Sequence, residues 1–184
     1  MRGRDKPLEL WAGDTLVSHV LESLPEGPVL ISANRSLTEY QALGWPVVQD
    51  GTDKDYEGPL AGIAASASAI DPPIDPTKEH SWLYVVPGDT PRLPVDLAAE
   101  LHSCCIETDT VAACVKTERL HPLPLIIRTD ALNSVHNYLA RGNRSVLGWL
   151  KELNHSTLNR PTDDALFVNI NTPEQLEHLN TTKP

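Results

Sequence analysis

Polar side chains stand at the ends of three short apolar segments in the first half of the chain. The segments are residues 28–34, 45–50 and 81–89, and the polar residues are Ser32 with Asn34, then Asp50, then Asp89. Short and nearly continuous apolar runs are typical of strands buried on both faces of a parallel sheet. In open α/β sheets, ligands bind beyond the C-terminal ends of the strands. A strand end can be polar simply because it meets water, but three that converge on one edge favour a binding site.

Asp89 carries the most specific chemistry of this group. It follows the apolar run LYVV in the turn PGDTP, which fixes a carboxylate at the mouth of the predicted sheet. Mg²⁺ prefers carboxylate and phosphate oxygens, so an Asp in this position is a natural ligand for it. Asp50 could accept hydrogen bonds from a base or a ribose, and Lys6 could meet a polyphosphate as a point charge. Together these residues predict a site for Mg²⁺ and a phosphate-bearing ligand.

The N-terminal sequence MRGRDKPLEL looks like the end of a phosphate-binding loop, because Gly3 and Arg4 are followed closely by Lys6. In α/β nucleotide-binding folds such a Gly-rich loop leaves the end of a buried strand, and a Lys shortly after it meets the phosphates. The two residues that precede Gly3 are too few for such a strand. From these residues alone, an ordinary polar terminus is the better interpretation, because the ends of domains are commonly poorly ordered.

Composition limits the class of protein. The chain has 184 residues, of which 40% are hydrophobic and 22% charged, as is ordinary for one globular domain. A net charge of −10 argues against a non-specific nucleic-acid binder, which must neutralise many phosphates. No apolar run approaches the ~18–20 residues that span a bilayer, and no secretory signal is present, so we expect a cytoplasmic protein that binds neither membrane nor nucleic acid. The three cysteines form no CxxC pair, and we interpret them as reduced and structural.

Helical patterns alternate with the apolar runs, which is typical of a doubly wound α/β sheet with right-handed crossovers. Apolar spacing predicts helices in residues 14–24, 58–70 and 97–105. Further on, strands are predicted in 109–118, 122–129 and 165–170, and helices in 131–142, 144–153 and 172–179. Thr172 and Gln175 form a capping box at the start of the closing helix. We therefore predict a single Rossmann-like α/β domain with a mostly parallel sheet, in which the Pro-rich residues 71–80 are a connector.

Eight segments of the chain resemble the molybdenum cofactor guanylyltransferase family in order and spacing. They are RGRDKPLEL, ISANR, VVQDG, YEGPLAG, VVPGDTPRLPVDL, RLHPLPLI, YLARGNRSVLGWL and FVNINTPEQL, and they extend over nearly the whole chain. GPLAG and DTP also occur in related nucleotidyltransferases, whereas NINTPEQL, HP and GNR point to the molybdopterin branch. The resemblance implies transfer of GMP from GTP to a molybdenum–molybdopterin cofactor, with release of pyrophosphate. It also implies a nucleotide-binding half, residues 1–107, and a pterin-cofactor-binding half, residues 108–184.

The resemblance further implies roles for individual residues. The residues implied in catalysis are Lys6 and Asp89, with Asp89 holding Mg²⁺; those implied in GTP binding are Lys6, Ser32, Asp50 and Asp89; those implied in pterin binding are His121, Arg144, Asn169 and Asn171. Ordinary structural roles are the alternatives on the pterin side: a turn for His121, a strand-to-helix turn for the two Asn residues, and a helix end for Arg144. Cofactor-loading proteins and molybdoenzymes are the partners that the family implies.

The beginning of the chain departs from the family pattern. Relatives start with a hydrophobic strand and a Leu-Ala-Gly-Gly loop, whose N–H groups cradle the nucleotide phosphates, and Met1 falls on a methionine that follows both. Loss of a strand from the middle of the sheet would expose two edges, so we expect the chain by itself to be poorly stable and to have little or no transferase activity. We interpret Met1 as an internal methionine of a longer reading frame; a degenerate gene or an altered paralogue is the alternative.

Two single residues also depart from the family pattern, and two other functions stay open. Ser32 stands where many relatives have Asn, and Gly88 where some have Cys, so no thiol role transfers to that position. Because base choice depends largely on the absent loop, a cytidylyl- or sugar-nucleotide transferase of the same fold stays open. A non-catalytic, truncated homologue that binds the pterin cofactor or a partner protein is the other alternative.

Overall fold

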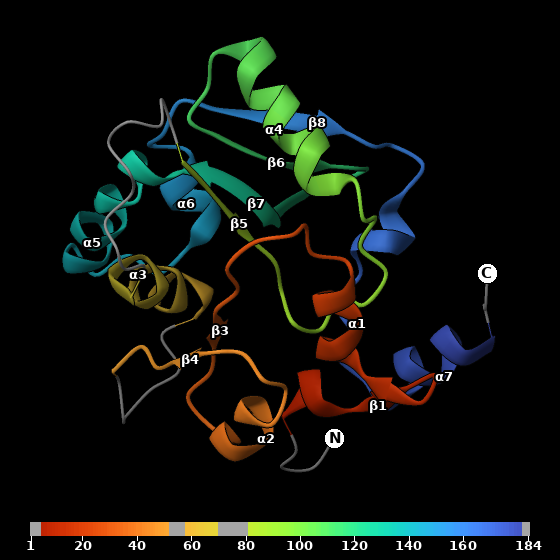
Figure 1. The fold of residues 1–184 in the computed structure, drawn as a ribbon. Coiled ribbons are helices and arrows are strands. Elements are labelled where there is room, and N and C mark those ends of the chain that lie inside the picture. Colours follow the sequence, from red (N-terminus) through yellow and green to blue (C-terminus); the bar gives the residue numbers. More distant parts are fainter. Residues whose placement is uncertain (1–4, 52–57, 70–80, 182–184) are drawn as a thin grey trace.

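The computed structural model describes residues 5–51, 58–69 and 81–181, and its largest sheet has four strands in the order β5–β7–β6–β8 (Figure 1). The strands are β5 (Trp82–Val85), β6 (Ala112–Lys116), β7 (Leu120–Arg128) and β8 (His155–Asn159). β7 runs antiparallel to both β5 and β6, whereas β6 and β8 are parallel. The α/β class is confirmed, with a mixed sheet in place of a mostly parallel one.

Two smaller sheets lie in the N-terminal part of the chain. β1 (Leu10–Trp11) pairs antiparallel with β2 (Asp14–Thr15), and β3 (Ile31–Ser32) pairs parallel with β4 (Val47–Val48). Within the described residues, β3 and β4 share no ladder with the four-stranded sheet.

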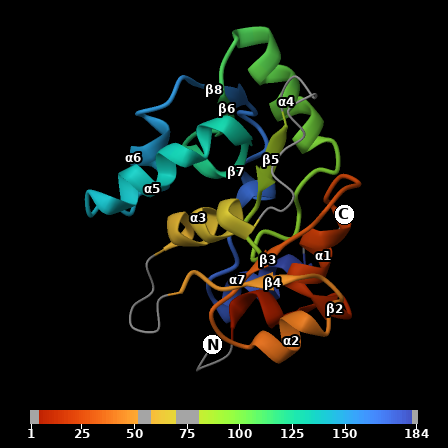
Figure 2. The same cartoon turned by 60° about the vertical axis from the view of Figure 1, so that its left-hand side comes forward.

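Helices cover both faces of the four-stranded sheet (Figures 1 and 2). α3 (Pro59–Ala69), α5 (Asn133–Ala140) and α6 (Val146–Leu150) cover one face, and α4 (Leu97–Thr108) covers the other. The remaining helices of the described residues are α1 (Leu16–Glu22), α2 (Leu37–Gln41) and α7 (Pro173–Thr181). Side chains alternate along β6: Ala112 and Cys114 pack with α3, α5 and α6, whereas Ala113 and Val115 pack with α4. Burial of both faces explains why this strand is apolar from Ala112 to Val115.

Side chains cap the first and the last helix, and the cap of the last one was predicted from the sequence. Thr15 accepts a hydrogen bond from the Ser18 N–H at 3.2 Å and begins α1. The capping box of α7 is also present, because the Gln175 N–H donates to Thr172 Oγ1 at 3.2 Å and the Thr172 N–H donates to Gln175 Oε1 at 3.1 Å. The expected connector at 71–80 lies outside the described residues. None of the helices in the described ranges is long and apolar enough to cross a membrane.

The prediction of a strand at 165–170 is wrong. Asp164–Phe167 form a short 3₁₀ helix, and the fourth strand of the sheet is β8 instead. The apolar residues of this segment serve two separate clusters: Phe167 packs beside α4, and Ile170 packs with Leu16 and Leu179. The segment is apolar because two of its residues point into the core, although its backbone is irregular and forms no strand. β8 has only one large apolar residue, Leu158, so its sequence carries little strand signal.

Candidate active site

Three distant parts of the chain meet at the turn after β5. Thr90 Oγ1 in that turn donates to Asn169 Oδ1 at 3.1 Å. Lys6 Nζ, near the start of the chain, donates to Asn171 Oδ1 at 2.8 Å. These two bonds bring one residue expected on the nucleotide side, Lys6, directly to one expected on the pterin side, Asn171. Their catalytic and binding roles stay predictions.

Asp89 lies in the same turn and is half-buried. Its backbone oxygen accepts a hydrogen bond from the Ile170 N–H at 2.9 Å, which fixes the turn against the segment before α7. Burial raises the pKa of the Asp89 carboxyl above its ordinary value, while a backbone hydrogen bond and the charge of Lys6 partly oppose the rise. A carboxylate that is held away from water gains from a further positive charge nearby.

This environment fits a cation at Asp89. Mg²⁺ takes carboxylate and phosphate oxygens and usually keeps several waters, so one protein carboxylate with a bound polyphosphate suffices. No group of three or more His, Cys, Asp or Glu residues suited to a metal occurs in the described part of the chain. A bound metal would therefore depend on Asp89 together with oxygens of the substrate.

Gly88 allows the turn to approach the N-terminal segment closely. A Cβ built on Gly88 would lie 3.2 Å from Cβ of Pro7 and 3.7 Å from Cγ2 of Val17. The first distance is tighter than an ordinary carbon–carbon contact, so the absence of a side chain at Gly88 favours the close packing. Pro7 directly follows Lys6, so the contact holds the backbone next to Lys6 close to the turn that carries Asp89.

Ser32 and Asp50 lie at the same end of the β3–β4 sheet, as the sequence predicts for strand ends. The side-chain oxygen of Asn34 accepts a hydrogen bond from the Asp50 N–H at 3.1 Å and joins the two chain segments that leave this sheet. Ser32 Oγ lies only 2.6 Å from the position of a Cβ on Gly62, so α3 can approach β3 this closely only with glycine there. Ser32 is exposed and Asp50 is half-buried.

Tyr40 is a buried titratable residue in this part of the molecule that the sequence analysis did not single out. It is buried in α2, with 4% of its surface exposed. Burial raises the pKa of its hydroxyl, and the charges of Asp5 and Asp89 add to the rise. The negative charge of Asp89 is thus one of the smaller causes of the raised pKa of Tyr40. A single aromatic residue in a five-residue helix gives no motif that could have revealed this position.

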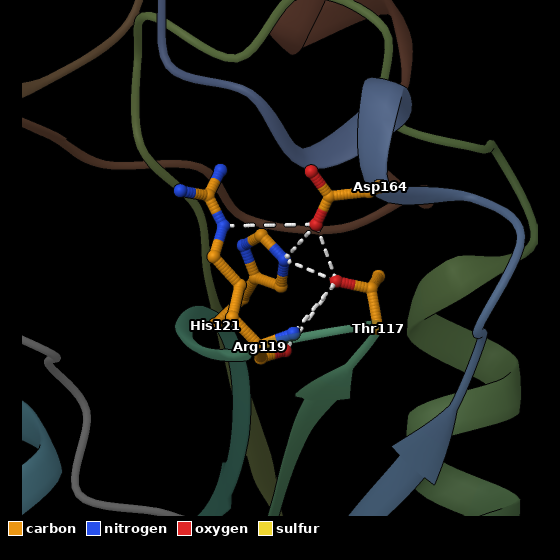
Figure 3. A network of polar contacts seen from close by, with 4 residues as sticks. All are labelled: Thr117, Arg119, His121 and Asp164. Carbon is orange, nitrogen blue, oxygen red and sulfur yellow. Dashed lines mark hydrogen bonds and ion pairs between the residues drawn. The ribbon is translucent and has the colours of Figure 1, made fainter.

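His121 lies in a buried polar cluster with Thr117 and Asp164 (Figure 3). His121 Nε2 is 2.8 Å from Thr117 Oγ1 and 3.2 Å from Asp164 Oδ1, and Thr117 Oγ1 donates to Asp164 Oδ1 at 2.5 Å. The Arg119 guanidinium adds an ion pair to Asp164 at 3.6 Å. The hydrogen bond from Thr117, then that from His121 and the charge of Arg119, hold the pKa of Asp164 below its usual range.

Arg144 lies in a different part of the molecule from Asn171. Its guanidinium donates to the backbone oxygens of Leu139 at 3.0 Å and Asn143 at 2.8 Å, at the turn between α5 and α6. Its own backbone oxygen is 3.9 Å from the position of a Cβ on Gly58, just before α3. Figures 1 and 2 show α6 and α7 on separate sides of the fold. The structure therefore does not join Arg144 to the other residues expected at the pterin side.

The fold is that of α/β nucleotidyltransferases. The molybdopterin-guanine dinucleotide biosynthesis protein A of Archaeoglobus fulgidus superposes with a TM-score of 0.72 at 19% identity, over 97% of this chain and 90% of that chain. A CMP:2-keto-3-deoxy-manno-octonic acid synthetase structure complexed with CTP superposes with a TM-score of 0.69 at 14% identity, over 96% of this chain and 90% of that chain. At these identities the likeness concerns the fold alone.

Sequence similarity identifies one family among the proteins that share this fold. Residues 1–156 match the MobA-like NTP transferase domain. The molybdenum cofactor guanylyltransferase of Photobacterium profundum is 31% identical over 184 residues, which cover 99% of this chain and 90% of the relative. That of Ralstonia pickettii is 35% identical over 192 residues, which cover 97% and 89%. The chain therefore belongs to the molybdenum cofactor guanylyltransferase family, as its motifs predict.

Proposed function

We propose that this protein transfers GMP from GTP to a molybdenum–molybdopterin cofactor in a Mg²⁺-dependent reaction. An oxygen of the cofactor's terminal phosphate forms a bond to the α-phosphorus of GTP, the bond between that phosphorus and the bridging oxygen to the β-phosphate breaks, and pyrophosphate leaves. The observation that carries the proposal, beside family membership, is the 2.8 Å bond from Lys6 to Asn171, which brings the two expected substrate sides together.

Charge stabilisation and positioning supply the catalysis, since phosphoryl chemistry of this kind needs no protein nucleophile. The Lys6 ammonium has three donors, so it can keep its bond to Asn171 while it holds a phosphate oxygen. Asp89 would hold Mg²⁺, which offsets the negative charge of the phosphates and of the leaving pyrophosphate. Asn169 and Asn171 would orient the acceptor, while Ser32 and Asp50 would contact the nucleotide.

The cellular setting follows from the same proposal. A guanylyltransferase of this family would work in the cytoplasm, where its product passes to cofactor-loading proteins and molybdoenzymes. The net charge of −10 suits neither a nucleic acid nor an anionic membrane surface as partner.

The decisive experiment measures transfer of α-labelled GMP to the pterin cofactor by the protein expressed from its complete gene, with and without Mg²⁺ and with CTP in parallel. Asp89→Ala is compared with Asp130→Ala, a matched carboxylate removal at a residue that pairs with Arg128 instead. We expect Mg²⁺-dependent transfer from GTP that Asp89→Ala reduces by roughly 100-fold or more and Asp130→Ala leaves intact. Preference for CTP, or cofactor binding without any transfer, would overturn the proposal.

A further inference from the structure

We propose that Thr117, His121 and Asp164 form a clamp that sets the position of Asn169 and Asn171, which makes His121 a positioning residue for the acceptor cofactor. The inference rests on the proposed function for what the two Asn residues bind. It differs from the role that the family resemblance implies for His121, because the imidazole acts here through other residues and does not touch the substrate.

An irregularity in the sheet turns His121 inward. Cys114 of β6 pairs with Leu125, but the next residue, Val115, pairs with His121, so residues 122–124 have no partner in the β6 register. Pro122 and Pro124 have no N–H to donate to a ladder, which is why the regular pairing breaks at this point. Bulges of this kind redirect the neighbouring side chains. As a result His121 is buried, with 6% of its surface exposed.

Within the clamp, the Thr117 hydroxyl donates one hydrogen bond and accepts another. Because Thr117 donates its hydroxyl hydrogen to Asp164, its oxygen accepts from the N–H on His121 Nε2. The same nitrogen also faces Asp164 Oδ1 at 3.2 Å. Thr117 is 6% exposed and its hydrogen is already given to a carboxylate, so it is no candidate for a nucleophile despite its neighbours.

The clamp fastens the β6–β7 hairpin to the segment that carries the two Asn residues (Figure 3). Asp164 begins the 3₁₀ helix, and Phe167 at its end lies against the His121 ring with centroids 5.5 Å apart. Asn169 follows two residues later. The next residue, Ile170, is held by its N–H bond to the Asp89 oxygen at 2.9 Å. The segment is therefore fixed on both sides of Asn169, by the clamp on one side and by the metal-binding turn on the other.

Alternative anchors of this segment are few among the described contacts. Thr90 reaches Asn169, and Lys6 reaches Asn171, but both bonds are made by the very groups whose orientation matters for the substrate. On the N-terminal side of Asn169, away from the proposed substrate contacts, the clamp acts together with the buried Phe167 and with the ion pair of Arg160 and Asp163. Loss of the clamp should let the segment move relative to Asp89 without removing any group that contacts GTP.

Thr117→Val removes the central hydroxyl at nearly constant shape, and Thr129→Val is its matched control. Thr129 is also buried, its hydroxyl donates to the Ser81 oxygen at 3.0 Å, and it follows the other end of β7. Thr117→Val should cost more stability than Thr129→Val, because the Thr117 hydroxyl contacts both Asp164 and His121, whereas that of Thr129 contacts the Ser81 oxygen. Only Thr117→Val removes hydrogen bonds of the clamp.

Hydrogen exchange at the Ile170 amide and steady-state kinetics are measured on both variants of the protein from its complete gene. We expect Thr117→Val to speed exchange at Ile170 about tenfold and to raise KM for the pterin acceptor about tenfold, the size of one lost buried hydrogen bond, with KM for GTP little changed. His121→Leu should behave like Thr117→Val, whereas His121→Gln, which keeps an N–H near the Nε2 position, should recover most of both effects. Thr129→Val should show neither effect.

Two results would overturn the clamp. One is exchange at Ile170 that Thr117→Val and Thr129→Val change equally; the other is a rise in KM for GTP as large as that for the acceptor. The exchange measurement needs no turnover, so absence of GMP transfer in the unaltered protein would refute the proposed function while the Ile170 result still decides whether the clamp exists.

Discussion

The region around the four-stranded sheet, here called the firmer half, is more extensively packed than the N-terminal region with β1 to β4, here called the weaker half. Around the four-stranded sheet, one apolar cluster contains thirteen buried residues, and strands as long as β7 carry the ladders. In the N-terminal part, strands β1 to β4 have two residues each, and the cluster around β3 contains only three buried residues, Val17, Ile31 and Tyr40. The firmer half supplies the turn with Asp89 and the clamp, whereas the weaker half supplies Lys6, Ser32 and Asp50.

The difference in packing predicts which groups of the site are fixed before a ligand binds and which become ordered on binding. Asp89 and the clamp are held without any ligand, so a metal and an acceptor that bind as proposed would meet groups that are already in place. The nucleotide contacts of the weaker half have less support from packing, and binding energy of the ligand can order them. The nucleotide should therefore stabilise the N-terminal part more than the sheet.

The largest effect we expect comes from the same core truncation made in each half. Ile127→Ala in β7 removes a fully buried side chain surrounded by long elements, and Ile31→Ala in β3 removes one that is 8% exposed in a small cluster. Because a loose site collapses around a cavity better than a rigid one, we expect losses of about 4 kcal/mol and about 2 kcal/mol respectively. Urea unfolding measures both, and equal losses would show that the two halves are equally firm.

Binding of GTP should have the next largest effect. With Mg²⁺ and GTP at about 100 times the Kd, the free energy of unfolding should rise by about 2.7 kcal/mol, and removal of Mg²⁺ with EDTA should abolish the gain. Hydrogen exchange would show where the gain falls. We expect it in α2 and in the segments around β3 and β4 more than in β6. A uniform slowing of exchange over the whole chain would contradict the difference between the halves.

A smaller effect concerns the charge of Asp89 in the absence of ligand. Burial raises the pKa of Asp89 above 3.8, its ordinary value, so the folded state binds a proton more readily than the unfolded state. Ionisation therefore destabilises the fold, fully so above the raised pKa and not at all below 3.8. Asp89→Asn should unfold at higher urea concentration than the unaltered protein at pH 7, and the difference should shrink as the pH falls through the raised pKa.

The control for this pH comparison is Asp130→Asn, which changes an exposed carboxylate that pairs with Arg128 at the end of β7. It should show no gain at pH 7. A variant Asp89→Asn that is less stable than the unaltered protein at neutral pH would mean that the ionised carboxylate is favoured by its surroundings, and the case for a cation at this position would weaken. The same variant should lose GMP transfer, so stability and activity move in opposite directions.

Sequence patterns predicted most of the fold because burial on both faces leaves a clear signal. The apolar runs before Asp50 and Asp89 are strands, and the helices α1, α3, α4 and α7 begin within a few residues of the expected positions. β8 was missed because a strand whose side chains are only half-buried has no continuous apolar run. The antiparallel course of β7 was also missed, since apolar pattern carries no information on strand direction.

The candidate site was only partly predictable for a different reason. Polar residues at strand ends are visible in the sequence, so Ser32, Asp50 and Asp89 could be named. The pairing of Lys6 with Asn171 spans nearly the whole chain and follows from tertiary packing alone. The clamp was invisible as well, because Thr117 and Asp164 are ordinary residue types in polar turns, and only the bulge at Pro122–Pro124 brings His121 to them.

The smallest effect we expect comes from a surface ion pair in the firmer half. Arg141 and Glu152 are paired, but their side chains are 56% and 48% exposed, so water and salt screen their attraction. Glu152→Gln should change the free energy of unfolding by about 0.5 kcal/mol or less. Glu100→Gln should lower the free energy of unfolding by more than Glu152→Gln does. Its partner Arg160 is only 24% exposed and is paired with both Glu100 and Asp163, so the change removes one of two partners of a half-buried guanidinium. If Glu152→Gln cost as much as Ile31→Ala, surface charge and not burial would account for the firmness of the sheet, and the contrast between the halves would need another cause.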